Sequence, residues 1–288
     1  MTGLGSVGVV GAGQIGTSLG MALKRSAPPG LGEVLAFDID LERSAQATRM
    51  GGADRALGAP EQILGVDTIV LAIPVSAIVG WLRTWGGAVR PGSLVVDTGS
   101  AKLVVVEAMR AHLDRGVRAV GGHPLCGTER NGPQAAAPEM LDGAPFALTP
   151  VREDAAALEL GLALVRAVGS VPVVVAAEKH DEILAATSHL PHLVATALLD
   201  LVPEDQAERA LWRVLVGPGF RGATRLAGSD PAMVAGFLSA NAGPTRSALQ
   251  GLLARLDDLD SALTSESALA VHLARACHGR ADLLEEIS

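Results

Sequence analysis

The chain is poor in aromatic residues. Phe, Trp and Tyr together make up 2% of its 288 residues, and tyrosine is absent. Leucine, valine and alanine must therefore fill the hydrophobic core, which can be large because 49% of the residues are hydrophobic. Only two cysteines occur, Cys126 and Cys277, and neither belongs to a paired-spacing motif. This usage gives no disulfide framework and is typical of a reducing compartment.

Long hydrophobic runs and an early basic segment are also missing. The most apolar stretch, residues 68–82, contains Pro74 and is too short to span a bilayer. The first basic side chain is Lys24, so no signal peptide is expected. The net charge of −8 argues against a nucleic-acid surface. We therefore expect a cytoplasmic protein that binds a small molecule, without a nucleic-acid or membrane partner.

The chain is rich in glycine near its beginning, between an apolar strand and a helix. Residues 7–10 (VGVV) precede the turn GAGQIG at residues 11–16, and a second apolar run ends at Asp38. In a dinucleotide site the first glycine makes the tight turn, the second lets a pyrophosphate approach, and the third lets the helix pack closely. The helix amino terminus then offers N–H groups to the phosphates. The alternative is an ordinary glycine-rich turn. The expected cofactor residues here are Gly11, Gly13, Gln14, Ile15, Gly16 and Asp38.

The cofactor expected from this pattern is NAD. Asp38 is placed to accept hydrogen bonds from a ribose 2′-hydroxyl, whereas its charge would repel a 2′-phosphate. The nearby Arg43 leaves NADP as the alternative. Ala72 and Pro74, at the end of another apolar run, could line the nicotinamide ribose, or they could simply mark the change from strand to helix.

Strands and helices alternate through the first part of the chain, which predicts a Rossmann-like, doubly wound parallel sheet of the α/β class. After residue 176 apolar residues recur at helical spacing and no strand is expected. We therefore expect a dinucleotide-binding domain over residues 1–176 and an all-helical substrate-binding and dimerisation domain over residues 177–288. Its leucine-rich faces could pack between two subunits of a homodimer or within one subunit. The expected strands are residues 7–10, 34–37, 68–72, 94–96, 119–122, 144–149 and 171–176, and the expected helices are residues 15–26, 41–50, 76–85, 103–113 and 155–168.

Two polar segments follow strands of the predicted sheet, at the edge where ligands bind in such folds. DTGSAK at residues 97–102 offers Ser100 as a hydrogen-bond donor, or serves only as a turn and helix cap. GGHPLCGTERNG at residues 121–132 offers His123, whose neutral imidazole can accept a proton near pH 7. The alternative is that His123 has only a structural role. No metal is expected, because His123 and Cys126 have no second ligand pair at suitable spacing.

Two further segments in the helical part carry candidate substrate residues. In TSHLPH at residues 187–192, Ser188 and His192 share one helix face, and Pro191 should kink the helix. Residues 217–231 are rich in glycine and contain Arg221 and Arg225, whose forked guanidinium groups suit a carboxylate. A capped helix break and a solvated loop are the respective alternatives.

Taken in order along the chain, these motifs resemble the prephenate dehydrogenase family, which includes arogenate and cyclohexadienyl dehydrogenases. The resemblance rests on the segments already described, on His180-Asp181 and on Ser229-Asp230-Pro231. It implies NAD-dependent oxidative decarboxylation of prephenate to 4-hydroxyphenylpyruvate in tyrosine biosynthesis. By this resemblance His123 is the catalytic hydrogen-bond partner of the 4-hydroxyl, and Ser100 positions that histidine and the nicotinamide. The implied substrate residues are Ser188, His192 and Arg225, with Glu129 paired to Arg225 and Arg221 as a second candidate.

The chain also departs from many relatives, which have tryptophan where it has Val234. It has no extra length for a fused chorismate mutase or a regulatory domain, so the resemblance does not extend to feedback inhibition by tyrosine. Arogenate or 4-amino-4-deoxyprephenate would differ from prephenate by one functional group, and no residue decides between them. Two alternatives belong to other classes of protein. One is a β-hydroxyacid dehydrogenase with Lys179 as its catalytic lysine, and the other is a non-catalytic dinucleotide sensor.

Overall fold

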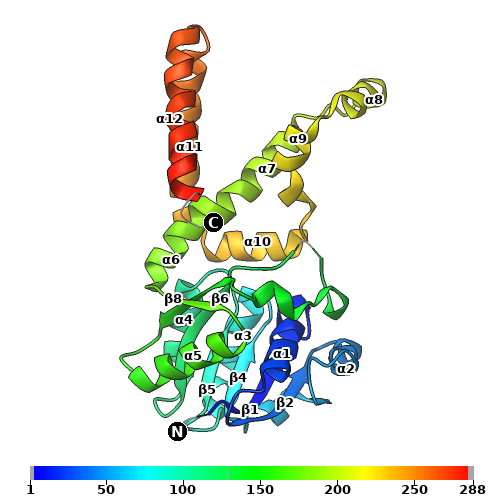
Figure 1. The fold of residues 1–288 in the computed structure, drawn as a ribbon, viewed down its shortest axis with the longest axis vertical. Helices are drawn as coiled ribbons and strands as arrows, with labels where there is room; N and C mark the ends of the chain where they lie inside the picture. Colours follow the sequence, from blue (N-terminus) through cyan, green and yellow to red (C-terminus); the bar gives the residue numbers. More distant parts are fainter. Residues whose placement is uncertain (1–2, 129, 285–288) are drawn as a thin grey trace. The chain divides into compact units, whose positions relative to one another are not determined.

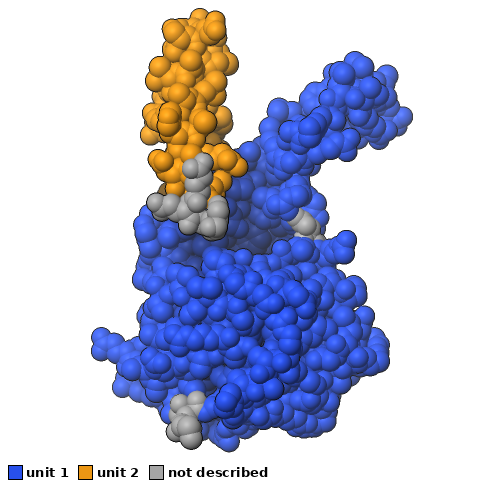
Figure 2. Space-filling view, viewed as in Figure 1, with its two compact units in different colours: residues 1–242 blue, residues 243–288 orange. Residues whose placement is uncertain are grey.

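The computed structural model describes residues 3–128 and 130–284. Residue contacts divide the chain into two compact units, residues 1–242 and 243–288 (Figure 2). The second unit contains the long helix α11 (Ala242–Ala262), except for its first residue, and α12 (Glu266–Leu284). The expected domain division between residues 176 and 177 is a different one, and it stays a prediction.

The first unit begins with alternating strands and helices (Figure 1). The observed bounds agree with the predicted elements to within a few residues, and the two-residue β3 is an addition. The elements are β1 (Gly5–Val10), α1 (Gln14–Ser26), β2 (Leu31–Phe37), α2 (Leu41–Arg49), β3 (Arg55–Ala56), β4 (Thr68–Leu71), α3 (Val75–Trp85), β5 (Leu94–Asp97), α4 (Leu103–His112), β6 (Arg118–Pro124), β7 (Pro145–Pro150), α5 (Ala155–Ala167) and β8 (Val171–Val174).

These strands form one sheet in the order β3-β2-β1-β4-β5-β6-β7-β8. All neighbours are parallel except β6 and β7, where His123 lies opposite Ala147 in an antiparallel pair. Between these two strands, the described residues (125–128 and 130–144) form two short 3-10 turns, Pro133–Ala135 and Pro138–Leu141, and no α-helix. Without a crossover helix the chain returns in the opposite direction. The expectation of a wholly parallel sheet is therefore corrected at this pair.

Alternate residues of the strands build two separate cores, one on each face of the sheet. Ile69 and Leu71 of β4 belong to one buried cluster with residues of α3 and α4, whereas Val70 belongs to the other with residues of α1 and α5. Successive side chains of a strand point to opposite faces, so helices on both faces bury all three. The fold is thus the predicted Rossmann-like α/β sheet.

After β8, the described residues form helices and no strand, as predicted. Just before Pro191, where a kink is expected, a π-helical turn joins α6 to α7. Proline lacks the N–H group, and its ring would clash with the carbonyl four residues earlier, so a widened turn just before it accommodates both effects. The elements are α6 (Ala177–Leu184), the π turn η5 (Ala185–His189), α7 (Leu190–Asp200), α8 (Gln206–Leu215), α9 (Pro218–Ala223), the 3-10 turn η6 (Arg225–Gly228) and α10 (Pro231–Ala240).

Candidate active site

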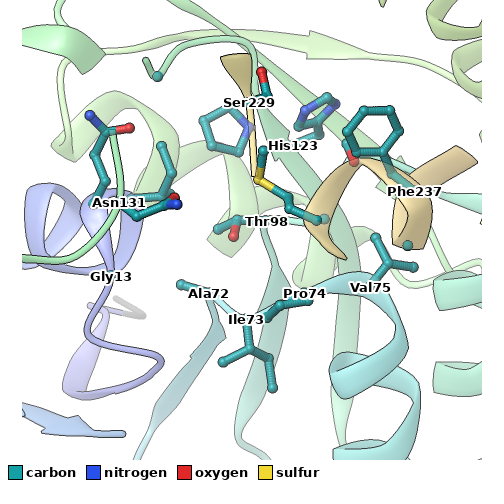
Figure 3. A pocket seen from close by; sticks show the side chains of 18 of the residues that line it. Gly13, Ala72, Ile73, Pro74, Val75, Thr98, His123, Asn131, Ser229 and Phe237 are labelled. Atoms are coloured by element: carbon teal, nitrogen blue, oxygen red, sulfur yellow. The ribbon is translucent and has the colours of Figure 1, made fainter. Parts of the chain in front are cut away.

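A cavity of about 490 Å³ lies at the carboxyl ends of β1, β4, β5 and β6, within the first unit (Figure 3). The strand ends contribute one wall, and α7, η6 and α10 contribute the other. Parallel strands direct their carboxyl ends to the same sheet edge, so residues distant in sequence meet there. Of the predicted site residues, the cavity is lined by Gly13, Gln14, Ile15, Ala72, Pro74, Ser100, His123, Ser188, His192 and Arg225.

The three glycines of the turn have different surroundings. A Cβ atom on Gly11, which has φ +101°, would lie 2.3 Å from the Ala72 carbonyl oxygen, and one on Gly16 would lie 2.0 Å from the Gly11 oxygen. A Cβ on Gly13 would meet no atom within 4 Å. Gly11 and Gly16 therefore allow the backbone to turn and pack, and Gly13 faces open cavity. With no side-chain cap on α1, this loop fits a pyrophosphate.

Gln14 holds the segment that follows β6 against the start of α1. Its Nε2 donates to Thr128 Oγ1 at 2.8 Å and to the Ala135 carbonyl at 3.0 Å, and its Oε1 accepts from the Thr128 N–H at 3.1 Å. The side chain thus joins two walls of the cavity that are more than 110 residues apart in sequence. Glu129, predicted to pair with Arg225, lies outside the described residues.

Asp38 is buried at the end of β2 and does not line the cavity. Its two carboxylate oxygens accept from the Ala12 N–H at 2.8 Å and from the Asp40 N–H at 2.9 Å. The carboxylate is therefore fixed beside the glycine turn. Arg43, the cation that leaves NADP as the alternative cofactor, lies 3.5 Å from the Asp40 carboxylate and so already has an anionic neighbour.

A buried ion pair supports the strand ends under the cavity. Lys102 and Asp97 are both fully buried and form a salt bridge, and Lys102 Nζ also donates to the Gly122 carbonyl at 2.6 Å. Asp97 accepts in addition from the Gly122 N–H at 2.9 Å. The pair therefore fixes the residue that immediately precedes His123. Lys102 does not line the cavity and is unsuited to binding substrate directly.

His123, which is half-buried, is the first member of a hydrogen-bonded chain that runs into the protein interior. Its Nδ1 lies 3.0 Å from Nε2 of His180, and Nδ1 of His180 lies 2.8 Å from an oxygen of Asp181. The Asp181 carboxylate also accepts from the N–H groups of Lys102 and Leu103, at 2.7 and 2.9 Å, where α4 begins. Sequence reasoning noted the pair His180-Asp181 as a family motif but gave it no role.

Burial lowers the pKa of three imidazoles at this site, those of His123, His189 and His192. It lowers the pKa of His123 well below 6.5, and the positive charge of Lys102 lowers it further. The pKa of His189 falls to about 4, again chiefly because of burial. Burial also lowers the pKa of His192. For Asp181, burial raises the pKa, but the hydrogen bonds from His180, Lys102 and Leu103 together outweigh it, so the pKa is lowered.

The helical wall provides the polar groups expected to meet a substrate. Ser188, His192 and Arg225 all line the cavity, and His192 packs edge-on against Phe237 with ring centroids 5.2 Å apart. Arg221, on α9, is exposed and does not line it. Of the two candidate arginines, only Arg225 is thus in position.

Three further observations bear on the class of protein. Cys126 lines the cavity, and burial raises the pKa of its thiol to about 11, so it is not a thiolate nucleophile at neutral pH. Within the described ranges, no three His, Cys, Asp or Glu side chains gather closely enough to hold a metal ion. In the part of the chain that the structure describes, no helix has both the length and the apolar character needed to cross a membrane.

Comparison with known proteins gives consistent matches. Residues 19–174 match the nucleotide-binding domain of prephenate dehydrogenase, and residues 176–275 match its dimerization domain. Cyclohexadienyl dehydrogenase from Zymomonas mobilis is 29% identical over 269 residues, which are 92% of this chain and 91% of that protein. The 4-amino-4-deoxyprephenate dehydrogenase of Streptomyces pristinaespiralis is 28% identical over 193 residues, covering 66% of this chain and 60% of that protein.

A solved structure extends the likeness to the fold of nearly the whole chain. Prephenate dehydrogenase from A. aeolicus, in complex with hydroxyphenyl propionate and NAD+, has a TM-score of 0.89 and 28% identity, and the match covers 98% of this chain and 99% of that one. The nucleotide-binding match alone spans more than half of the 288 residues. This chain therefore belongs to the prephenate dehydrogenase family, a family of dehydrogenases with a nicotinamide dinucleotide cofactor.

Proposed function

We propose that this protein catalyses the NAD-dependent oxidative decarboxylation of prephenate to 4-hydroxyphenylpyruvate, in the cytoplasm. The observation that carries the proposal is the shared cavity, which brings a half-buried imidazole, His123, and a guanidinium, Arg225, to the glycine turn of a dinucleotide fold. A dianionic cyclohexadiene needs a fixed cation to bind it and a base at its 4-hydroxyl to make C4 electron-rich.

The residues of the cavity have separate tasks in this reaction. When bound, NAD would supply the acceptor for the hydride that leaves C4 of the ring. His123 accepts the proton of the 4-hydroxyl and returns it to the phenolate oxygen that forms when the ring carboxylate leaves as CO2. Arg225 holds a substrate carboxylate, with Ser188 and His192 beside it. Ser100, which lines the same cavity as His123, positions the imidazole and the nicotinamide.

The direct test measures NAD reduction with three substrates side by side: prephenate, arogenate and 4-amino-4-deoxyprephenate. We expect the highest kcat/KM with prephenate. Preference for either of the others would keep the reaction class and change the substrate. Binding of the cofactor without turnover of any of them would favour a dinucleotide sensor, and turnover of a β-hydroxyacid instead would favour that class of dehydrogenase.

NAD is expected to be used with a kcat/KM at least ~10-fold higher than that of NADP. A hydrogen bond to a charged group contributes about 1.5–3 kcal/mol, and a 2′-phosphate would replace that bond with repulsion from Asp38. Steady-state kinetics with both cofactors measure the ratio. Asp38→Asn should bring the ratio of the two kcat/KM values closer to one, whereas Asp40→Asn should change this ratio less. A preference of the wild-type protein for NADP would refute the role of Asp38.

A homodimer is expected, with the apolar face of α8 at the subunit interface. Leu211, Val214 and Leu215 lie on one face of this helix and are 58%, 81% and 73% exposed. Burying such a face between copies removes apolar surface from water. Sedimentation velocity at micromolar concentration should show a dimer, and Val214→Asp should shift it toward monomer, whereas Arg213→Ala should not. A wild-type protein that is only monomeric would contradict this prediction.

A further inference from the structure

Two hydrogen bonds join Asp181 to His180 and His180 to His123. The Asp181 carboxylate determines which atom donates and which accepts in each of them. The Asp181 carboxylate is 2% exposed and lies at the start of α4, where it accepts from two backbone N–H groups. These donors and the positive end of the helix dipole favour the ionised carboxylate. An ionised carboxylate can only accept hydrogen bonds. Nδ1 of His180, 2.8 Å away, must therefore carry the hydrogen.

The position of His180 is fixed independently of His123. Asn241, at the end of α10, is 3% exposed and donates to the Asp181 backbone carbonyl at 2.7 Å. The same amide nitrogen lies 3.0 Å from Nδ1 of His189. These contacts hold the backbone of α6 beside the π turn. His180 itself is 2% exposed, so its ring cannot turn into solvent to exchange partners.

We propose that His180, oriented by Asp181, fixes the tautomer of His123 and thereby makes its Nε2 the proton acceptor of the cavity. In a neutral His180 with hydrogen on Nδ1, Nε2 is an acceptor, so the hydrogen in the 3.0 Å contact belongs to Nδ1 of His123. The ring centroids lie 5.2 Å apart at an interplanar angle of 69°, so the rings are not stacked, and an in-plane N–H of one ring can point at the in-plane lone pair of the other. Nε2 is then the nitrogen of His123 that remains for a substrate hydroxyl. This role deepens the proposed function and rests on it.

The charged and titratable groups around His123 are consistent with an uncharged ring. Lys102, His180 and His189 all disfavour its protonation, and burial acts in the same direction. The proton that His123 takes from a substrate is thus held only transiently. His180 is a positioning residue, because it does not line the cavity and acts through His123.

The experiment determines the tautomer of His123 by two-dimensional ¹⁵N NMR of the full-length protein labelled at its seven histidines, without substrate or cofactor. The signals of His123 are those lost in His123→Asn. We expect hydrogen on Nδ1 and an unprotonated Nε2 in the wild type. His180→Leu should move hydrogen to Nε2, whereas His180→Gln, which keeps an acceptor near the place of Nε2, should preserve the wild-type pattern. His278→Leu, at an exposed histidine, is the matched control.

Turnover gives a second readout. His180→Leu should lower kcat by about 10- to 100-fold with little change in KM for prephenate, and His180→Gln should recover most of the loss. A wild-type His123 with hydrogen on Nε2, or a tautomer unchanged in His180→Leu, would overturn the proposal. If His180→Leu does not fold, the wild-type and His180→Gln tautomers still decide it. If the wild type oxidises no cyclohexadiene, the proposed function is wrong. The NMR measurement of the His123 tautomer then still tests the role of His180.

Discussion

Replacing His123 by asparagine is expected to lower kcat by about 100-fold or more, with the affinity for NAD unchanged. The physical reason is that asparagine can donate or accept a hydrogen bond but cannot take a proton at neutral pH, and general-base catalysis typically contributes about 10²- to 10⁴-fold. His123 lines the cavity at the end of β6, with its Nδ1 already directed to His180. Steady-state kinetics with prephenate measure kcat, and fluorescence titration measures NAD binding.

The matched control for this variant is His112→Asn, at the end of α4 and outside the cavity. It should retain turnover. A His123→Asn variant with near-normal kcat would remove His123 from the chemistry, whereas loss of NAD binding together with turnover would indicate a disturbed fold instead.

The pH dependence of kcat follows from the same imidazole. Burial and the charge of Lys102 lower the pKa of His123 well below 6.5. The base must be unprotonated to act, so activity should be retained as pH falls through 6.5 and should be lost only at lower pH, when His123 gains a proton. A pH–rate profile with its acidic limb at or above pH 6.5 would contradict this assignment.

Replacing Arg225 by alanine is expected to raise KM for prephenate by about 30-fold or more, with a smaller effect on KM for NAD. Prephenate carries two carboxylates and the chain has a net charge of −8, so binding requires a local fixed cation. Removing a charge-assisted pair from a desolvated site typically costs about 2–5 kcal/mol, and 2 kcal/mol corresponds to about 30-fold. Steady-state kinetics with each substrate varied in turn give both KM values.

Arg221→Ala provides the matched control in the same glycine-rich segment, because Arg221 is exposed and does not line the cavity. It should change KM for prephenate much less. If the two effects were reversed, the carboxylate-binding role would belong to Arg221, and the alignment of this segment with the family motif would be wrong.

The sequence by itself determined the elements of the sheet and the glycine turn. Buried strands appear as uninterrupted apolar runs, and a turn that must bring α1 against β1 permits no side chain at Gly11 or Gly16, so local patterns are sufficient there. The helical character after β8 was equally readable from the spacing of leucine and valine. The candidate residues Ser100 and His123 were predicted because both follow apolar strands, and parallel strands end at one edge.

Only the tertiary structure decided which side chains meet. No local pattern shows that β7 runs antiparallel to β6, because the direction depends on whether the connecting segment crosses the sheet. Likewise the composition of the glycine-rich segment does not distinguish Arg221 from Arg225. The family resemblance favours Arg225, and the folding of α9 and η6 brings Arg225, but not Arg221, to the cavity. His180 lies 57 residues after His123, and its contact depends on how α6 packs beside α4. Local sequence encodes backbone preference, whereas the partner of a side chain is set by the packing of whole elements.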